Sequence, residues 1–145
     1  VDVSGGTKLT DGAVESAVMD QADKDIVIVE GQGSILHPGS SATLPLMRGT
    51  CPTHMILCHI ARNNSLRSLE NIKIPDLKKF IDLNEQLASV IGTYPNAKVL
   101  GVALNTIEMK NNEALKMRKK VEENTGLPST DVIRYGGDKI FDKLL

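Results

Sequence analysis

The feature that most constrains this chain is a run of four β-branched apolar residues, Ile26–Val29, that ends at a carboxylate, Glu30. A continuous apolar run of this kind is typical of a strand buried on both faces, as in a parallel sheet. Two glycines, Gly31 and Gly33, follow with one residue between them. Because open α/β sheets bind ligands just beyond the carboxyl ends of their strands, we expect a binding site at this point.

Further strands and helices alternate along the chain. Apolar runs predict strands at 54–59 and 98–105, and Asp131–Tyr135 is predicted to be a short last strand. Helix signals predict helices over about 12–23, at 42–47, between Pro75 and Gly92, and over about 111–125. This alternation favours an α/β fold with a three-layer, mostly parallel sheet flanked by helices, in one domain over residues 1–145.

Polar side chains end each of the three main predicted strands. Glu30 ends the first, His59 ends the second with Arg62 three residues on, and Asn105 ends the third. In a parallel sheet the carboxyl ends of the strands lie along the same edge. We therefore expect Glu30, His59 and Asn105 to share one rim.

The first group of these residues suits the chemistry of phosphate-bearing ligands. Glu30 can hold Mg²⁺ that is shared with phosphates, or it is a solvent-facing acid at a strand end. Gly31 and Gly33 let the backbone approach a ligand closely, or they serve a turn. His37 can act as a general base or bind an anion, or it is a loop histidine bonded to the backbone.

The second group carries similar pairs of alternatives. His59 is a base candidate or a structural histidine. Arg62 can bind phosphate or carboxylate through its guanidinium group, or it is a solvated surface residue. Asn105 offers an amide suited to a base or a carbonyl group, or it is a turn residue.

Composition excludes several classes of protein. A net charge of −1 offers no basic face for nucleic acid, and the aromatic content of 3% without Trp offers no stacking platform. No apolar run approaches the roughly 20 residues that span a bilayer. Two cysteines make no disulfide framework, and with His54 and His59 they lack the ligand spacing of a zinc site. We expect a cytoplasmic protein that binds neither nucleic acid nor membrane.

Several short motifs together resemble a known family. They are Val-Glu-Gly-Gln-Gly-Ser with His-Pro after it, then Leu-Cys-His, Gly-Val-Ala-Leu-Asn-Thr and Thr-Gly-Leu-Pro, in this order. The series resembles the C-terminal P-loop-type domain of a family long filed as a domain of unknown function, and it covers nearly the whole chain. Some members of that family are described as D-glutamate N-acetyltransferases of D-amino-acid catabolism.

The resemblance implies a nucleotide- or CoA-binding domain of an enzyme that acylates an acidic amino acid, with Mg²⁺ and ATP or acetyl-CoA as cofactors. Glu30 would handle the metal or the reacting amine, and His37 or His59 would move protons. The site residues it implies are Glu30, His37 and His59 for catalysis and Gly31, Gln32, Gly33, Arg62 and Asn105 for cofactor binding.

A more distant similarity supports a second reading. Glu30–Gly33 is similar to the Glu-Gly-Ala-Gly segment of dethiobiotin synthetase, where the glutamate helps to bind Mg²⁺. Gly101–Asn105 is similar to the base-recognising asparagine strand of that superfamily. The alternatives are therefore an ATP-dependent ligase of this type, or a nucleotide-sensing or scaffolding module without catalysis.

One departure from the family pattern concerns phosphate binding. No G-x-x-x-x-G-K-[ST] motif occurs in the sequence, and nothing in it corresponds to the family's N-terminal Rossmann-like domain. We expect a P-loop NTPase-like fold that lacks the phosphate-loop strand and forms the C-terminal part of a longer protein, inactive on its own. The resulting sheet edge would be covered by a partner or by a second copy, and we expect a homo-oligomer.

Overall fold

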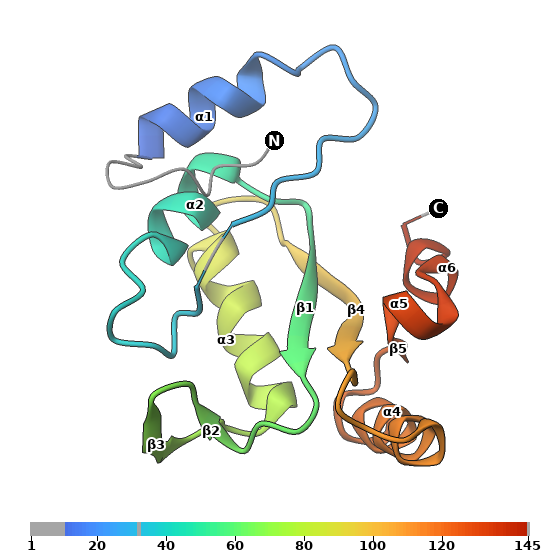
Figure 1. Ribbon diagram of the computed structural model, residues 1–145. Helices are drawn as coiled ribbons and strands as arrows, with labels where there is room; N and C mark the ends of the chain where they lie inside the picture. The colour runs from blue at the N-terminus through green and yellow to red at the C-terminus, as the bar shows by residue number, and fades with distance from the viewer. Residues whose placement is uncertain (1–10, 32, 145) are drawn as a thin grey trace. The chain divides into compact units, whose positions relative to one another are not determined.

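The computed structural model describes residues 11–31 and 33–144 of the chain. The chain divides into two compact units, Val1–Pro52 and Thr53–Leu145, and each is described by itself. Figure 1 shows the order of the elements along the chain. The expectation of a single domain over residues 1–145 stays a prediction.

The first unit contains two helices that pack against each other, α1 (Asp11–Met19) and α2 (Thr43–Thr50). Val14 of α1 is fully buried. Pro45 lies in the first turn of α2, where the N–H that proline lacks has no helical partner to lose. Both predicted helices are confirmed, although α1 ends before the predicted boundary and passes into turns.

The prediction that Ile26–Val29 forms a strand buried on both faces is wrong. These four residues are not assigned to a strand, and Glu30 forms only an isolated bridge. The side chains of Ile26 and Ile28 are 51% and 76% exposed, while the two valines are half-buried. An apolar run shows which side chains are stabilised when they are removed from water. Burial on both faces also needs packed neighbours on each side, and the run itself does not provide them. One face of the run is therefore partly covered, not both.

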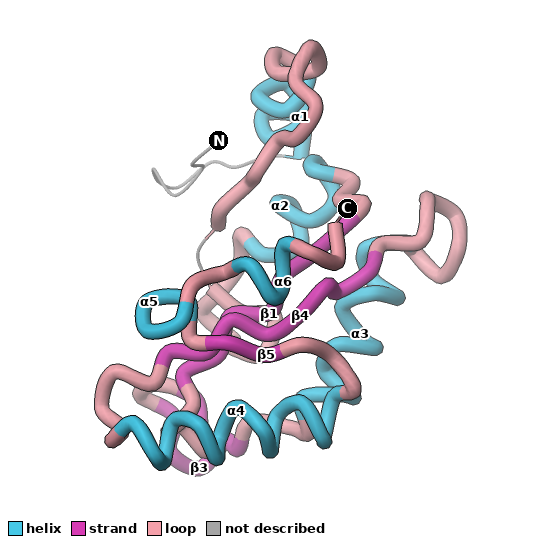
Figure 2. The backbone as a smooth tube through the Cα atoms, turned by 90° about the vertical axis from the view of Figure 1, so that its right-hand side faces the viewer, coloured by secondary structure: helices cyan, strands magenta, loops and turns pink. Residues whose placement is uncertain are grey.

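The second unit is built on a parallel sheet of three strands in the order β1 (His54–Ile60), β4 (Lys98–Asn105), β5 (Ser129–Thr130). Figure 2 shows these strands as a central layer with helices on both sides. The mostly parallel sheet flanked by helices confirms the predicted α/β fold class.

One face of this sheet carries the main core. The register pairs Leu57 with Val102 and His59 with Leu104, which puts these four side chains on the same face. Helices α3 (Leu77–Ser89) and α4 (Asn111–Thr125) cover it with core side chains. His59 therefore stands at the end of the core face.

On the opposite face, two short helices cover β4 and β5: α5 (Val132–Tyr135) and α6 (Asp138–Phe141). Close approach of α6 depends on Gly101, because a Cβ there would lie 2.7 Å from the Pro128 carbonyl oxygen and 2.9 Å from Ile140. This face is closely packed at Gly101. The candidate site lies further along it, at the carboxyl ends of the strands.

Helix ends follow their capping residues. Asp76 caps α3 by accepting a hydrogen bond from the Lys79 N–H at 3.1 Å. Gly126, with φ of 72°, ends α4 at the predicted boundary. The end of α3 was predicted at Gly92, but the helix stops at Ser89 because Val90 already adopts a positive φ of 47°. None of the described helices is long and apolar enough to cross a membrane.

The predicted last strand over Asp131–Tyr135 is wrong. The strand is β5, and the following residues form α5. The Asp131 carboxylate accepts hydrogen bonds from the N–H groups of Ile133 and Arg134, at 3.0 and 3.1 Å. This N-terminal cap favours a helical turn and outweighs the β preference of valine and isoleucine. A small antiparallel hairpin, β2 (Ser65–Leu66) and β3 (Leu69–Lys73), was not predicted.

Candidate ligand-binding site

A cavity of about 570 Å³ opens in the second unit at the carboxyl ends of β1 and β4. Its walls come from three places: the end of β1, the end of β4 with the residues after it, and the start of α5. The volume lies within the range of small-molecule sites in proteins. The position is the one at which open α/β sheets bind their ligands.

His59 and Asn105 both line this cavity, so two of the three predicted strand-end residues share a rim. Their side chains start from opposite faces, however. The register pairs Ile60 with Asn105 and His59 with Leu104, and successive residues of a strand point to opposite sides. Asn105 therefore belongs to the open face, whereas His59 reaches the rim from the core face.

The Asn105 side chain is held in one orientation. Its Oδ1 accepts a hydrogen bond from the Ile107 N–H at 3.1 Å, and its backbone carbonyl accepts from the Ala61 N–H at 3.0 Å. No described residue accepts a hydrogen bond from its amide NH₂ group. Asn105 can therefore donate two hydrogen bonds to a ligand that presents acceptor atoms.

His59 is half-buried at the end of β1. Burial lowers the pKa of its imidazole from the ordinary value of 6.5, because the charged form loses hydration. The ring is therefore neutral at neutral pH, and a neutral imidazole can accept a proton.

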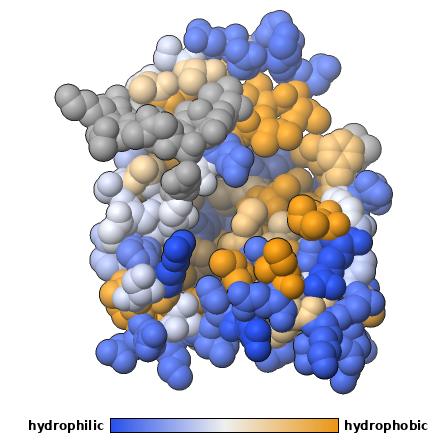
Figure 3. All heavy atoms as spheres, viewed as in Figure 1, coloured by the Kyte–Doolittle hydropathy of each residue, from blue (hydrophilic) through white to orange (hydrophobic). Residues whose placement is uncertain are grey.

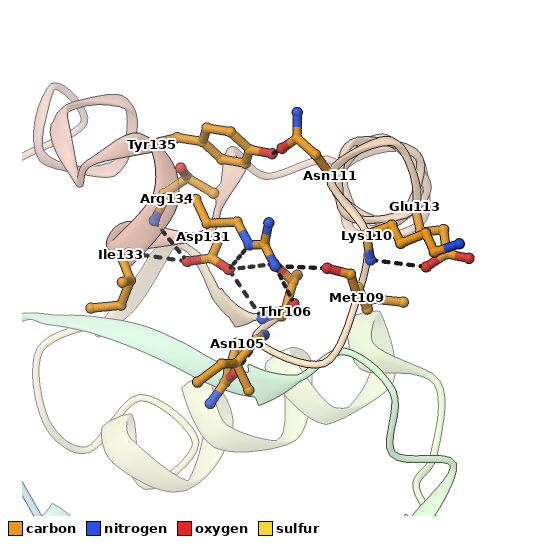
Figure 4. A network of polar contacts seen from close by, with 12 residues as sticks. Asn105, Thr106, Met109, Lys110, Asn111, Glu113, Asp131, Ile133, Arg134 and Tyr135 are labelled. Atoms are coloured by element: carbon orange, nitrogen blue, oxygen red, sulfur yellow. Dashed lines mark hydrogen bonds and ion pairs between the residues drawn. The ribbon is translucent and has the colours of Figure 1, made fainter.

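A buried carboxylate that the sequence analysis missed joins two walls of the cavity (Figure 4). Asp131 accepts from the backbone N–H of Thr106 at 3.1 Å and also from the Thr106 hydroxyl. Burial acts to raise the pKa of Asp131, but hydrogen bonds from Thr106, Arg134 and Ile133 together lower it below 3.8. The only sequence signal was an aspartate just before the apolar pair Val132–Ile133, which is also a helix-capping pattern.

Arg134 completes the same junction. Its Nη2 donates to the carbonyl oxygens of Thr106 and Met109, at 2.9 and 2.7 Å, and its Nε lies 3.5 Å from Asp131 Oδ2. The guanidinium group is the one cationic side chain that lines the cavity among the described residues. Nη2 and Nε of Arg134 are therefore committed to contacts within the protein.

Exposed apolar side chains surround the cavity. Ile107 after β4 is 80% exposed, and Ile133 of α5 is 92% exposed. Figure 3 shows hydrophobic residues on the surface near the ends of β1 and β4, among hydrophilic neighbours. A flat or apolar ligand group placed here would remove this surface from water, which is worth roughly 25 cal/mol per Å².

Arg62 lies beside the site but does not line it. Its Nη1 contacts Glu108 of the segment after β4, with 3.4 Å to Oε2. Both side chains are mostly exposed, and exposed ion pairs contribute little. The predicted cofactor contact from Arg62 stays a prediction.

The glycines of the first unit are explained by packing inside that unit. A Cβ on Gly31 would overlap the Leu46 side chain of α2. Gly33 has a φ of +96°, and a Cβ there would overlap the hydroxyl of Ser40. Their approach to a ligand stays a prediction, and Gln32 lies outside the described residues.

His37 is held by its own loop. The Gly39 N–H donates to its Nδ1 at 3.1 Å, and the His37 N–H donates to the Ser34 carbonyl oxygen at 2.9 Å. Nε2 is then the nitrogen that remains for a substrate or an anion. This geometry agrees with the loop-histidine alternative and leaves the catalytic one open.

Glu30 is exposed and belongs to the first unit, so its predicted meeting with His59 and Asn105 stays a prediction. Residues 11–31 and 33–144 contain no cluster of three or more His, Cys, Asp or Glu that could hold a metal ion. A Mg²⁺ held by one carboxylate together with ligand phosphates needs no such cluster. Glu30 therefore fits only a metal that arrives with a phosphate-bearing ligand.

The parallel sheet with helices on both faces and a cavity at its carboxyl edge defines a three-layer α/β domain. The model of a P-loop domain described as a domain of unknown function, DUF1611_C, matches residues 7–141. The chain belongs to this family.

Relatives and a solved structure agree with this assignment. The chain is 32% identical over 134 residues to a protein of Tritonibacter scottomollicae named D-glutamate N-acetyltransferase, and 30% identical to a protein of Pseudoalteromonas with the same name. It covers 40% of each relative, with 92% of its own length aligned. A crystal structure of a DUF1611 family protein from Anabaena variabilis matches with a TM-score of 0.89 and 42% identity, covering 92% of this chain and 39% of that one.

Proposed function

We propose that this chain is the nucleotide- or CoA-binding domain of a D-glutamate N-acetyltransferase-like enzyme of D-amino-acid catabolism. The observation that carries the proposal is the cavity at the carboxyl ends of β1 and β4, with Asn105 presenting its amide group there. The names of two relatives supply the reaction class. Because the chain spans two fifths of these relatives, the activity belongs to the protein at its full natural length.

The cavity suits the uncharged part of such a cofactor. Its rim is apolar, its amide donor can meet the acceptor atoms of a base, and its cationic side chain is already engaged. The phosphates of ATP or CoA would extend out of it, toward Arg62, and Gly31 and Gly33 remain the glycines proposed to contact them. Mg²⁺ would be shared between those phosphates and Glu30.

The proposed reaction is acyl transfer from the thioester of acetyl-CoA to the amine of an acidic amino acid. The neutral amine attacks the thioester carbonyl carbon, a C–N bond forms, the C–S bond breaks, and CoA leaves as a thiolate. The amine proton passes through a base to the thiolate. His59, neutral because burial lowers its pKa, would be that base, with His37 as the alternative.

The proposed setting is the cytoplasm, with the protein acting as a homo-oligomer on a small acidic substrate. An apolar cofactor site on a protein with a net charge of −1 supports a small-molecule partner over nucleic acid.

The test is a thiol-release assay of the full natural-length protein with acetyl-CoA and D-glutamate, with L-glutamate as the matched control. We expect thiol release that depends on D-glutamate and needs no ATP. The variant Glu30→Gln should lower kcat or the response to Mg²⁺. Unchanged turnover of this variant would remove Glu30 from the mechanism.

The alternatives give different outcomes in the same assay. ATP consumption with a carboxylate substrate and without acetyl-CoA would indicate a ligase of the dethiobiotin synthetase type. Tight binding of ATP or acetyl-CoA without turnover would indicate a sensing or scaffolding module. Either result would replace the acyltransferase proposal.

A further inference from the structure

Asp131, Thr106 and Arg134 form a hydrogen-bonded junction, and their side chains are less exposed than the exposed apolar side chains around the cavity. Asp131 is 4% exposed and Thr106 is 2% exposed. One carboxylate accepts four hydrogen bonds: from the Thr106 N–H and hydroxyl at Oδ2, and from the Ile133 and Arg134 N–H groups at Oδ1. These bonds join parts of the chain that are 25 residues apart in sequence.

The two joined parts are the two facing walls of the cavity. Asn105 and Ile107 line it from the segment after β4, and Val132 and Ile133 line it from α5. Thr106 lies between the first pair, and Asp131 directly precedes the second. The carboxylate therefore sets the distance between the walls at their base.

Arg134 fixes the same walls from a second direction. Its side chain leaves α5 and donates to two carbonyl oxygens of the opposite segment, Thr106 and Met109 (Figure 4). Two carbonyls bound by one planar group define the path of the backbone between them. Ile107, mostly exposed at the rim, lies within that path.

The charges of this junction balance within the protein. Arg134 Nε lies 3.5 Å from Asp131 Oδ2, and the two side chains are 28% and 5% exposed. Because Nη2, Nε and the charge of the guanidinium group are engaged within the protein, Arg134 acts on the site through geometry.

We infer that Asp131, Thr106 and Arg134 are positioning residues, which hold the Asn105–Met109 segment and α5 at the spacing that the cofactor of the proposed function needs. The inference rests on the proposed function, because it concerns the same cavity. It predicts that weakening the junction lowers affinity for the cofactor even where the protein stays folded.

The test uses the full natural-length protein and calorimetric titration with acetyl-CoA, then with ATP. Thr106→Val removes the hydroxyl and keeps the shape of the side chain, whereas Thr106→Ser keeps the hydroxyl. Arg134→Lys keeps the charge but has a single nitrogen, so it cannot meet both the carbonyl oxygens that Nη2 binds and the Asp131 Oδ2 that lies beside Nε. Lys119→Gln removes one exposed charge on α4 and is the control.

We expect Thr106→Val and Arg134→Lys to raise the Kd for whichever probe binds by about tenfold or more, as displaced positioning groups do. The number of sites per folded protein should not change. Thr106→Ser and Lys119→Gln should stay within about twofold of the parent Kd. A raised Kd with an unchanged number of sites is the signature that a role in folding alone would not produce.

Two failures are distinguishable. If the parent protein binds the probe and the Thr106→Val and Arg134→Lys proteins bind it with unchanged Kd, or lose only the number of competent sites, the positioning role is overturned. If the parent protein binds neither acetyl-CoA nor ATP, the proposed function itself is overturned, and the inference falls with it.

Discussion

Two polar segments of this chain differ in how their contacts are made. In the segment from Glu30 to Ser40, the recorded hydrogen bonds of Ser34, His37 and Ser40 reach partners two or three residues away. At the junction of β4 and α5, Thr106, Asp131 and Arg134 bind across 25 to 28 residues. The longest sequence motif, from Val29 to Pro38, lies mostly in the first segment, and the structure has its cavity at the second.

This difference shows that a segment recognised by its sequence motif need not be the one whose side chains are held in place by long-range contacts. Short-range bonds shape a loop, and each can break at little cost to its neighbours. Long-range bonds between buried groups hold two elements at a fixed spacing, and each depends on the rest. We therefore expect substitutions at the junction to change stability more than substitutions in the Glu30–Ser40 segment.

The largest expected effect is that of Asp131→Ala. Removing this carboxylate leaves the Thr106 donors and the Arg134 charge without their acceptor, which should lower the free energy of unfolding by about 3 kcal/mol. Urea denaturation measures this loss. The control is Asp82→Ala on the exposed side of α3, where the loss should stay within about 0.5 kcal/mol.

Acid titration sharpens the same prediction. Because the folded-state pKa of Asp131 lies below 3.8, its contribution is present above that pH and is lost as the pH falls through the folded value. Asp131→Ala should remove this part of the acid sensitivity. An acid-unfolding profile unchanged by the substitution would contradict the assignment.

Gly101→Ala tests the packing behind the cavity and should cost about 2 kcal/mol. The new Cβ would meet the Pro128 carbonyl oxygen at 2.7 Å, and a backbone atom in the sheet cannot easily move away. Gly137→Ala, whose Cβ would meet nothing within 4 Å, is the control. Equal denaturation midpoints for these two variants would argue against close packing of α6 on β4.

Gly33→Ala tests the local segment and should cost about 1 kcal/mol. The cause is the φ of +96°, which an alanine adopts with strain, together with overlap with Ser40. Gly12→Ala within α1 has open space around its Cβ and should be neutral or stabilising. A loss at Gly33 larger than that at Asp131 would reverse the comparison between the two segments.

The smallest expected effect is the pH dependence contributed by His59. Since burial lowers its folded pKa below 6.5, the unfolded state binds more protons as the pH falls, and stability decreases below about pH 6.5. The decrease should be under about 1.4 kcal/mol per pH unit. Unfolding between about pH 5 and 8 measures it. His59→Gln should abolish this slope, and His54→Gln at the exposed start of β1 should retain it.

Much of the fold follows from local patterns. Apolar runs identified β1 and β4, and Pro75 and Gly126 placed the start of α3 and the end of α4. The last strand was predicted wrongly because two local signals compete there. The Asp131 carboxylate accepts from the N–H groups of Ile133 and Arg134 and starts α5, whereas the apolar pair Val132–Ile133 favoured a strand.

The candidate site was also predicted only in part from the sequence. Parallel strands bring His59 and Asn105 to one edge, as their positions in the sequence predicted. Their opposite faces follow from the register of β1 against β4, which includes a shift between Met55 and Ile56. A one-residue shift reverses every side chain beyond it, and no pattern within one strand reveals it. Arg134 was missed because only folding brings it to Thr106.

The most direct test of the account is ligand protection of Cys58, an exposed thiol that lines the cavity. The full natural-length protein would be alkylated with and without saturating acetyl-CoA, and the modification of each cysteine followed by mass spectrometry. Cys51, exposed in the first unit, is the internal control. The account predicts that acetyl-CoA slows modification of Cys58 and leaves Cys51 unchanged, whereas bound acetyl-CoA with an unchanged rate at Cys58 would contradict a ligand site at the carboxyl edge of this sheet.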